Sequence, residues 1–180
     1  MDLHEINELL DTPEPPELGP GPRAGIKPVR DLNRALDELD GKSELTQEKG
    51  QLIRALLLLW HDHLDAAHQI AQDLESADGA FVHGIMHRRE PDYGNAAYWF
   101  RRVGRHPAFP EMAKRASALL EAKGDHELFQ TLMPRGEWDA FAFITACEEG
   151  SSKSNSEQRK QILREVQAME TRVLLECFCG

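Results

Sequence analysis

The feature that most constrains the fold is a long stretch of helical periodicity in the first half of the chain. Apolar residues recur about every 3.6 positions at Leu52, Leu56, Leu59, Ala66, Ile70 and Leu74. No proline interrupts this stretch, and Asp78-Gly79 follows it as a stop signal. The pattern predicts one long amphipathic helix over residues 46–75.

Shorter segments of the same periodicity fill most of the remaining chain. They predict a short amphipathic segment over 3–10 that docks on the core, and helices over residues 29–41, 80–89, 95–103, 110–123, 126–133, 137–149 and 156–177. No stretch alternates strictly between apolar and polar residues, and no Asn-Gly hairpin signal occurs. We therefore expect an all-α fold, an irregular or orthogonal bundle of about seven or eight helices.

The segment between the first two predicted helices is rich in residues that break helices. Residues 11–28 hold six of the chain's ten prolines, with glycines among them. This composition favours an extended arm that lies over the body, or a linker. With 180 residues the chain suits one domain. We therefore divide it into residues 1–28, a short helix with the Pro-rich arm, and residues 29–180, a single helical domain.

Composition and cysteine content indicate the environment of the protein. The longest apolar run, residues 55–60, has six residues, whereas a membrane helix needs about 20. The first residues are acidic and lack the basic and apolar regions of a signal peptide. Three cysteines are an odd number, and Cys177 and Cys179 lie at the chain end, so no disulfide framework is indicated. We expect a cytoplasmic protein that binds no membrane.

Charge is unevenly distributed along the chain. The net charge of −10 disfavours general binding to nucleic acid. Residues 87–115 nevertheless contain seven basic residues against three acidic ones, and we call this window the basic island. Two explanations stay open: ion pairs with the acidic helices, or a site for a phosphate or carboxylate ligand.

Histidines are clustered, and the first cluster lies at residues 61–68. Five of the eight histidines fall within residues 61–87, and imidazole is both a common metal ligand and a group that titrates near neutral pH. On a continuous helix, His61, Asp65 and His68 would share one stripe, so the carboxylate could orient either imidazole. A solvated helix face explains the stripe equally well.

The second cluster lies at residues 83–90. His83, His87 and Glu90 follow one another at intervals of about one helical turn, which can bring two imidazoles and a carboxylate to one divalent metal ion. Pairs of histidines at this spacing also arise by chance in a His-rich chain. A divalent metal is therefore one possible cofactor, and its ligands would be these three residues.

Aromatic and basic residues follow at once. Tyr98 and Arg102 share one helical face beside Trp99, and a guanidinium next to aromatic rings can hold a flat or anionic ligand. Packing between helices is the alternative interpretation. The ligand-binding candidates are Arg88, Arg89, Asp92, Asn95, Tyr98, Trp99 and Arg102.

The same region carries a long motif. The run HGIMHRREPD from His83 to Asp92 is followed by Asn95-Ala, by YWFRRVG from Tyr98 to Gly104, and by His106-Pro107. This pattern resembles a group of hypothetical proteins from bacteria and fungi over about residues 55–150. The resemblance implies membership of that group, and it implies no activity and no catalytic residue.

Two functional hypotheses follow. In the first, the stretch 60–68 meets the two stretches at 83–90 and 98–102 in a pocket for a small anionic or polyhydroxylated molecule. Acid/base chemistry of a hydrolase or lyase type would come from His61, His83, His87 and Glu90. In the second, the chain is a helical protein-interaction module without chemistry, weakly similar in residues 96–102 to tetratricopeptide helices.

Overall fold

The computed structural model describes residues 2–41, 44–152 and 156–180. Within these residues there are ten α-helices, one short 3-10 helix and no strand, so the prediction of an all-α fold is confirmed. The helices are α1 (Leu3–Leu9), α2 (Val29–Asp40), α3 (Gln47–Trp60), α4 (Leu64–Ala71), α5 (Ala77–Arg89), α6 (Tyr93–Val103), α7 (Phe109–Lys123), α8 (His126–Leu132), α9 (Ala140–Gly150) and α10 (Glu157–Cys179), with the 3-10 helix η1 (Pro134–Gly136) before α9.

The predicted count of seven or eight helices is wrong, and one reason lies at residues 61–63. The single helix predicted over 46–75 is divided there into α3 and α4. Asp62 adopts a φ of 62°, a left-handed conformation that Asp tolerates better than most residues. Its buried carboxylate accepts hydrogen bonds from Arg23 (2.6 Å) and Arg89 (2.7 Å). These bonds hold the break in place, and α4 therefore leaves α3 in a new direction.

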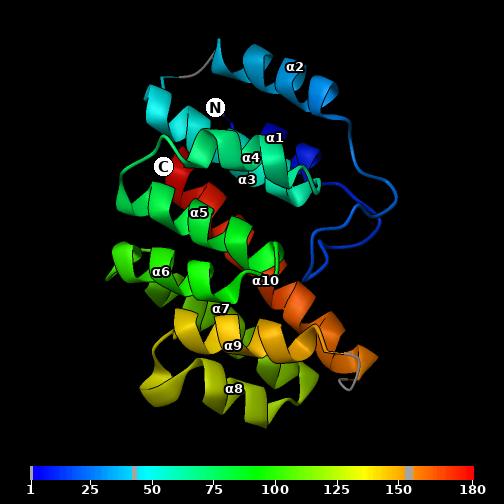
Figure 1. Cartoon of the computed structure of the whole chain (residues 1–180), viewed down its shortest axis with the longest axis vertical. Coiled ribbons are helices and arrows are strands. Elements are labelled where there is room, and N and C mark those ends of the chain that lie inside the picture. The colour runs from blue at the N-terminus through cyan, green and yellow to red at the C-terminus, as the bar shows by residue number, and fades with distance from the viewer. Residues whose placement is uncertain (1, 42–43, 153–155) are drawn as a thin grey trace.

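Most helices stack side by side in one row, which Figure 1 shows from α2 to α8. Neighbouring contacts run from α2 to α3, α4, α5 and α6, and then from α6 to α9 and α8. The last helix, α10, crosses behind the row and contacts α3, α7 and α9 (Figure 1). One continuous core results, in which the second half of α3, from Leu52 to Trp60, is almost entirely buried apart from Arg54.

Residues 11–28 contain no helix and lie against the helical body. Arg164 of α10 donates hydrogen bonds to the carbonyl oxygens of Pro15 and Pro16, and Gln167 donates to that of Glu17. Leu18 is buried in the core. None of the described helices is both long and apolar enough to cross a membrane.

The tightest helix pair is α5 with α6, and a glycine permits it. A Cβ atom on Gly84 would lie 2.7 Å from the ring of Phe100, closer than real Cβ contacts occur. Gly84 lies between His83 and His87 on α5, so the close approach of α6 also covers these two histidines.

Candidate metal centre

Three histidines from two helices converge where α4 meets α5. His68 comes from α4, and His83 and His87 come from successive turns of α5. Each offers a ring nitrogen, and these nitrogens all lie within 4.8 Å of one another. We call these residues the histidine triad. Figure 1 shows α4 and α5 as neighbours in the stacked row.

The rings of the triad are held by aromatic stacking. His83 is sandwiched between Trp99 of α6, with ring centroids 3.9 Å apart, and His87, at 4.9 Å. His68 meets both imidazoles edge-on, at 4.9 Å from His83 and 5.4 Å from His87. Each ring of the triad therefore contacts at least two other aromatic rings.

One imidazole of the triad has a buried nitrogen without a hydrogen-bond partner. His83 is 3% exposed, and its Nδ1 atom is buried without a partner. A buried nitrogen of this kind costs about 1–3 kcal/mol unless something binds it. A metal ion is one partner to which an imidazole nitrogen can donate its lone pair.

Burial also favours the neutral form of His83 and His87 by lowering the pKa of each. Desolvation, assisted by the nearby His87 and His68, lowers the pKa of His83 to about 4. Desolvation likewise lowers the pKa of His87, although Glu90 opposes the shift. Neutral imidazole is the form that binds metal, so His83 and His87 need to lose no proton at neutral pH before they can act as ligands.

Glu90 and Asn95 contact the two ring nitrogens of His87 and so influence which of them carries the proton. The carboxylate of Glu90 lies 3.2 Å from Nδ1 of His87, and the Asn95 amide lies 3.1 Å from Nε2. If Nδ1–H donates to Glu90, Nε2 accepts a hydrogen bond from the Asn95 amide, and a metal ion at Nε2 would replace that hydrogen bond. A carboxylate behind a metal-binding histidine fixes the tautomer and raises the basicity of the ligand.

The histidine triad lies close to the molecular surface. His68, Glu90, Asn95 and Trp99 around it are all half-buried rather than enclosed. Zn²⁺ holds imidazole nitrogens at about 2.0–2.1 Å in tetrahedral geometry. Ligation would therefore draw the three nitrogens closer together than 4.8 Å, a movement that side-chain rotation provides. Three nitrogen ligands would leave a fourth position for water or substrate.

The structure brings some of the sequence candidates together at the triad. His83, His87 and Glu90 lie there, with Asn95 against His87 and Trp99 against His83. Arg102 lies beyond Trp99, with its guanidinium 5.2 Å from the centre of the Trp99 ring. These six candidates come from α5, α6 and the residue that ends α5.

His61 lies elsewhere and is fully engaged. It ends α3, is completely buried, accepts a hydrogen bond from the Lys27 backbone N–H at Nδ1, and contacts the Leu9 carbonyl oxygen through Nε2 at 2.7 Å. Burial lowers its pKa. The predicted stripe of His61, Asp65 and His68 is wrong because the chain turns at Asp62, so His68 belongs to a separate helix.

The remaining arginine candidates are engaged in ion pairs within the fold. Arg88 is fully buried, pairs with Glu170 of α10 and lies 4.4 Å from the centre of the Phe143 ring. Arg89 pairs with Asp62 and donates to the carbonyl oxygens of Leu59 and Gly19. Both arginines thus connect helices or pin residues 11–28, as the ion-pair explanation of the basic island expects.

Asp92 and Tyr98 border the triad: the Asp92 backbone N–H donates to the His87 carbonyl oxygen at 3.0 Å, and the Tyr98 ring meets Trp99 edge-on at 5.5 Å. The Asp92 carboxylate caps α6 by accepting the Asn95 backbone N–H at 3.1 Å. Tyr98 is 46% exposed and has the guanidinium of Arg101 6.0 Å from its ring centre.

His68 is the member of the triad that the sequence analysis did not select. In the single helix predicted over 46–75, the side chain of His68 lies on the same face as that of His61. A signal for the break was present in Asp62, a residue type that tolerates positive φ. A second signal was that the apolar positions shift to another helical face, that of Leu64, Ala67 and Ala71, which is the buried face of α4.

No model of a known protein family, no curated protein and no solved structure matches this chain. The resemblance to the group with the HRREPD and YWFRRVG motifs stays a prediction.

Proposed function

We propose that this protein binds one transition-metal ion, Zn²⁺ above all, at His68, His83 and His87, and uses it in hydrolase- or lyase-type chemistry. The observation that carries the proposal is the buried, unpartnered Nδ1 of His83 inside a set of three imidazoles whose nitrogens lie within 4.8 Å. Imidazole ligands suit Zn²⁺, Cu²⁺, Fe²⁺ and Ni²⁺ rather than Mg²⁺ or Ca²⁺.

The chemistry would come from a water molecule on the metal ion that these three histidines would hold. A Zn²⁺ ion with three protein ligands lowers the pKa of its bound water to about 7, which supplies hydroxide at neutral pH. Glu90 would hold His87 in the binding tautomer, and the Asn95 amide would lie within reach of a water on the metal. Arg102 and Trp99 would supply a cation and an aromatic face beside the triad, which suits a small anionic or polyhydroxylated substrate.

A helical interaction module without chemistry is the second candidate. It is favoured by the pairing of much of the basic island: Arg88 with Glu170, Arg89 with Asp62, and Arg115 with Glu111 and Glu176. The three cysteines are free thiols, which supports the reducing cytoplasm as the place of action for either candidate.

A Zn²⁺ competition titration against a chromophoric chelator tests the proposal. The wild-type protein should take up about one equivalent, and His68→Gln, His83→Gln and His87→Gln should each weaken binding about 100-fold. His126→Gln is the matched control because His126 is exposed on α8, away from the triad. Circular dichroism verifies that each variant keeps its helix content.

Two results would overturn the proposal. One is the absence of competitive uptake of Zn²⁺, Co²⁺ and Ni²⁺ by the wild-type protein. The other is uptake that the three triad variants reduce no more than His126→Gln does, which would place the metal on surface histidines.

A further inference from the structure

A second candidate binding site lies outside the histidine triad, where the chain between α6 and α7 meets the turn before α9. A cavity of about 610 Å³ opens there, a size within the range of small-molecule sites. Its walls include Arg105, Phe109, Ala113, Lys114, Glu137 and Trp138. One side of the cavity comes from the start of α7, and the other comes from residues 136–138.

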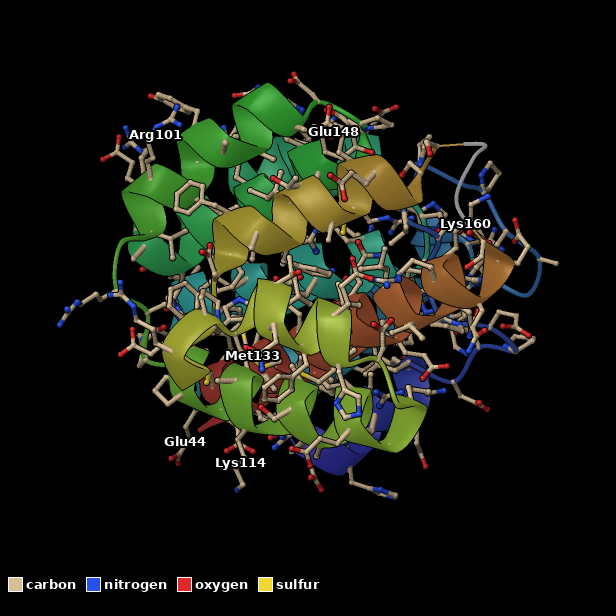
Figure 2. The ribbon with its side chains drawn as sticks, turned by 90° about the horizontal axis from the view of Figure 1, so that it is seen from below. Glu44, Arg101, Lys114, Met133, Glu148 and Lys160 are labelled. Atoms are coloured by element: carbon tan, nitrogen blue, oxygen red, sulfur yellow. The ribbon has the colours of Figure 1, made fainter. Side chains whose placement is uncertain are left out.

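The cavity holds basic groups that the fold leaves without strong partners. Within the described residues, Arg105 makes no hydrogen bond or ion pair, in contrast with Arg88, Arg89 and Arg115. Lys114 is 78% exposed and approaches only Glu111, at 3.5 Å, and Figure 2 shows its side chain projecting outward from α7. Two cations at the edge of a cavity with one carboxylate, Glu137, favour an anionic occupant.

The wall of the cavity also contains an unsatisfied donor. Trp138 is 6% exposed, and the N–H of its indole is buried without an acceptor, which is rare for a buried tryptophan. His106 also lines the cavity, but both of its ring nitrogens already have hydrogen-bond partners. Its Nε2 lies 2.6 Å from the Asp78 carboxylate, and its Nδ1 accepts the backbone N–H of Ala108.

The remaining walls are apolar. Phe109, Pro110 and Ala113 line the cavity beside the Trp138 indole. An aromatic body fits such walls by stacking and by burial of apolar surface. A charged group on that body would meet the cations at the edge.

We propose that this cavity binds a small aromatic carboxylate, with its ring against Phe109 and Trp138 and its carboxylate paired with Arg105 and Lys114. Arg105 contributes most, because a guanidinium can grip a carboxylate with two parallel hydrogen bonds. The site does not depend on the metal centre.

Calorimetric titration with 1-naphthoate tests the site, on full-length protein freed of metal with EDTA so that the anion cannot bind a metal ion. The expected result is saturable binding with one site, weakened about tenfold in the uncharged amide, 1-naphthamide, because the ion pair is lost. Arg105→Ala should weaken naphthoate binding about tenfold, and Trp138→Phe should weaken it about threefold.

Arg101→Ala is the matched control, since Figure 2 shows Arg101 on the outer side of α6 and it does not line the cavity. It should change naphthoate affinity less than about twofold. The proposal is overturned if naphthoate and benzoate both fail to saturate at millimolar concentration. It is also overturned if the amide binds as well as the acid, or if Arg105→Ala and Arg101→Ala behave alike.

Discussion

The indole of Trp99 lies face to face with the imidazole of His83, with centroids 3.9 Å apart and ring planes 18° from parallel. Trp99 belongs to α6 and His83 to α5, so the geometry of the histidine triad depends on how closely these two helices pack. Gly84 sets that distance, because its missing Cβ leaves room for the Phe100 ring.

Gly84→Ala should therefore destabilise the protein and loosen the triad. The new Cβ meets the Phe100 ring at 2.7 Å, and overpacking of this kind costs about 1–3 kcal/mol. The control is Gly94→Ala, where a Cβ has only Asp92 within reach, at 4.0 Å. Urea denaturation should show a loss for Gly84→Ala and a neutral or slightly favourable effect for Gly94→Ala. Equal effects would show that α6 does not pack on α5 at this position.

Glu90→Gln should weaken Zn²⁺ binding without removing it. The amide replaces the carboxylate that lies 3.2 Å from His87 Nδ1, and loss of such a partner reduces metal affinity about 10- to 100-fold. Competition titration measures the change. Glu148→Gln, at an exposed position of α9, should leave the affinity as it is. If Glu90→Gln abolishes binding as fully as His83→Gln, Glu90 is itself a ligand, as the spacing of His83, His87 and Glu90 predicts.

The metal-free protein should lose stability as pH falls from about 6.5 to about 4. In the unfolded protein the pKa of His83 is about 6.5, whereas in the folded protein it is about 4. Between these values the unfolded state holds more protons, so the free energy of unfolding decreases as pH decreases. The contribution of His83 is about 1–2 kcal/mol, because solvent close to the triad screens part of the effect.

Urea denaturation at several pH values measures this loss. His83→Gln should flatten the pH dependence in that window, and His126→Gln, at an exposed site, should leave it unchanged. An identical pH dependence in all three proteins would mean that His83 is not buried in its neutral form.

How far the sequence predicts this structure depends on the element. The all-α fold and most helix positions follow from apolar spacing and from stop signals such as Gly124, which ends α7 in the left-handed conformation. The break at Asp62 does not follow, because it depends on Arg23 and Arg89, which reach Asp62 from distant parts of the chain. His68 could not be joined to His83 and His87 without that break.

The candidate site divides in the same way. Neighbours on one helix, such as His83 and His87, are predictable from spacing alone. Contacts between helices are not: the sequence does not tell that Arg88 finds Glu170 on α10 while Arg105 stays unpaired. Ion pairing and ligand binding were both open for the basic island. Tertiary packing places Arg88 and Arg89 in ion pairs and leaves Arg105 without one in the described part of the chain.

Asp62→Asn should destabilise the protein and free residues 11–28. Asn tolerates the left-handed backbone at this position as Asp does. The loss of stability therefore measures the effect of removing the negative charge between Arg23 and Arg89, whose side chains are 7% and 2% exposed. Breaking a buried pair on one side costs about 3–5 kcal/mol. Limited proteolysis should cut the variant within residues 11–28 faster than the wild type. Asp65→Asn, on the exposed face of α4, should be cut at the wild-type rate.

X-ray absorption spectroscopy of the Zn²⁺-loaded protein tests the histidine triad most directly, because it counts imidazole ligands. The expected wild-type spectrum fits three imidazole nitrogens and one oxygen at about 2.0–2.1 Å, and His68→Gln should reduce the count to two. A zinc ion surrounded by oxygens alone, or an imidazole count that His68→Gln leaves unchanged, would contradict a metal centre at His68, His83 and His87.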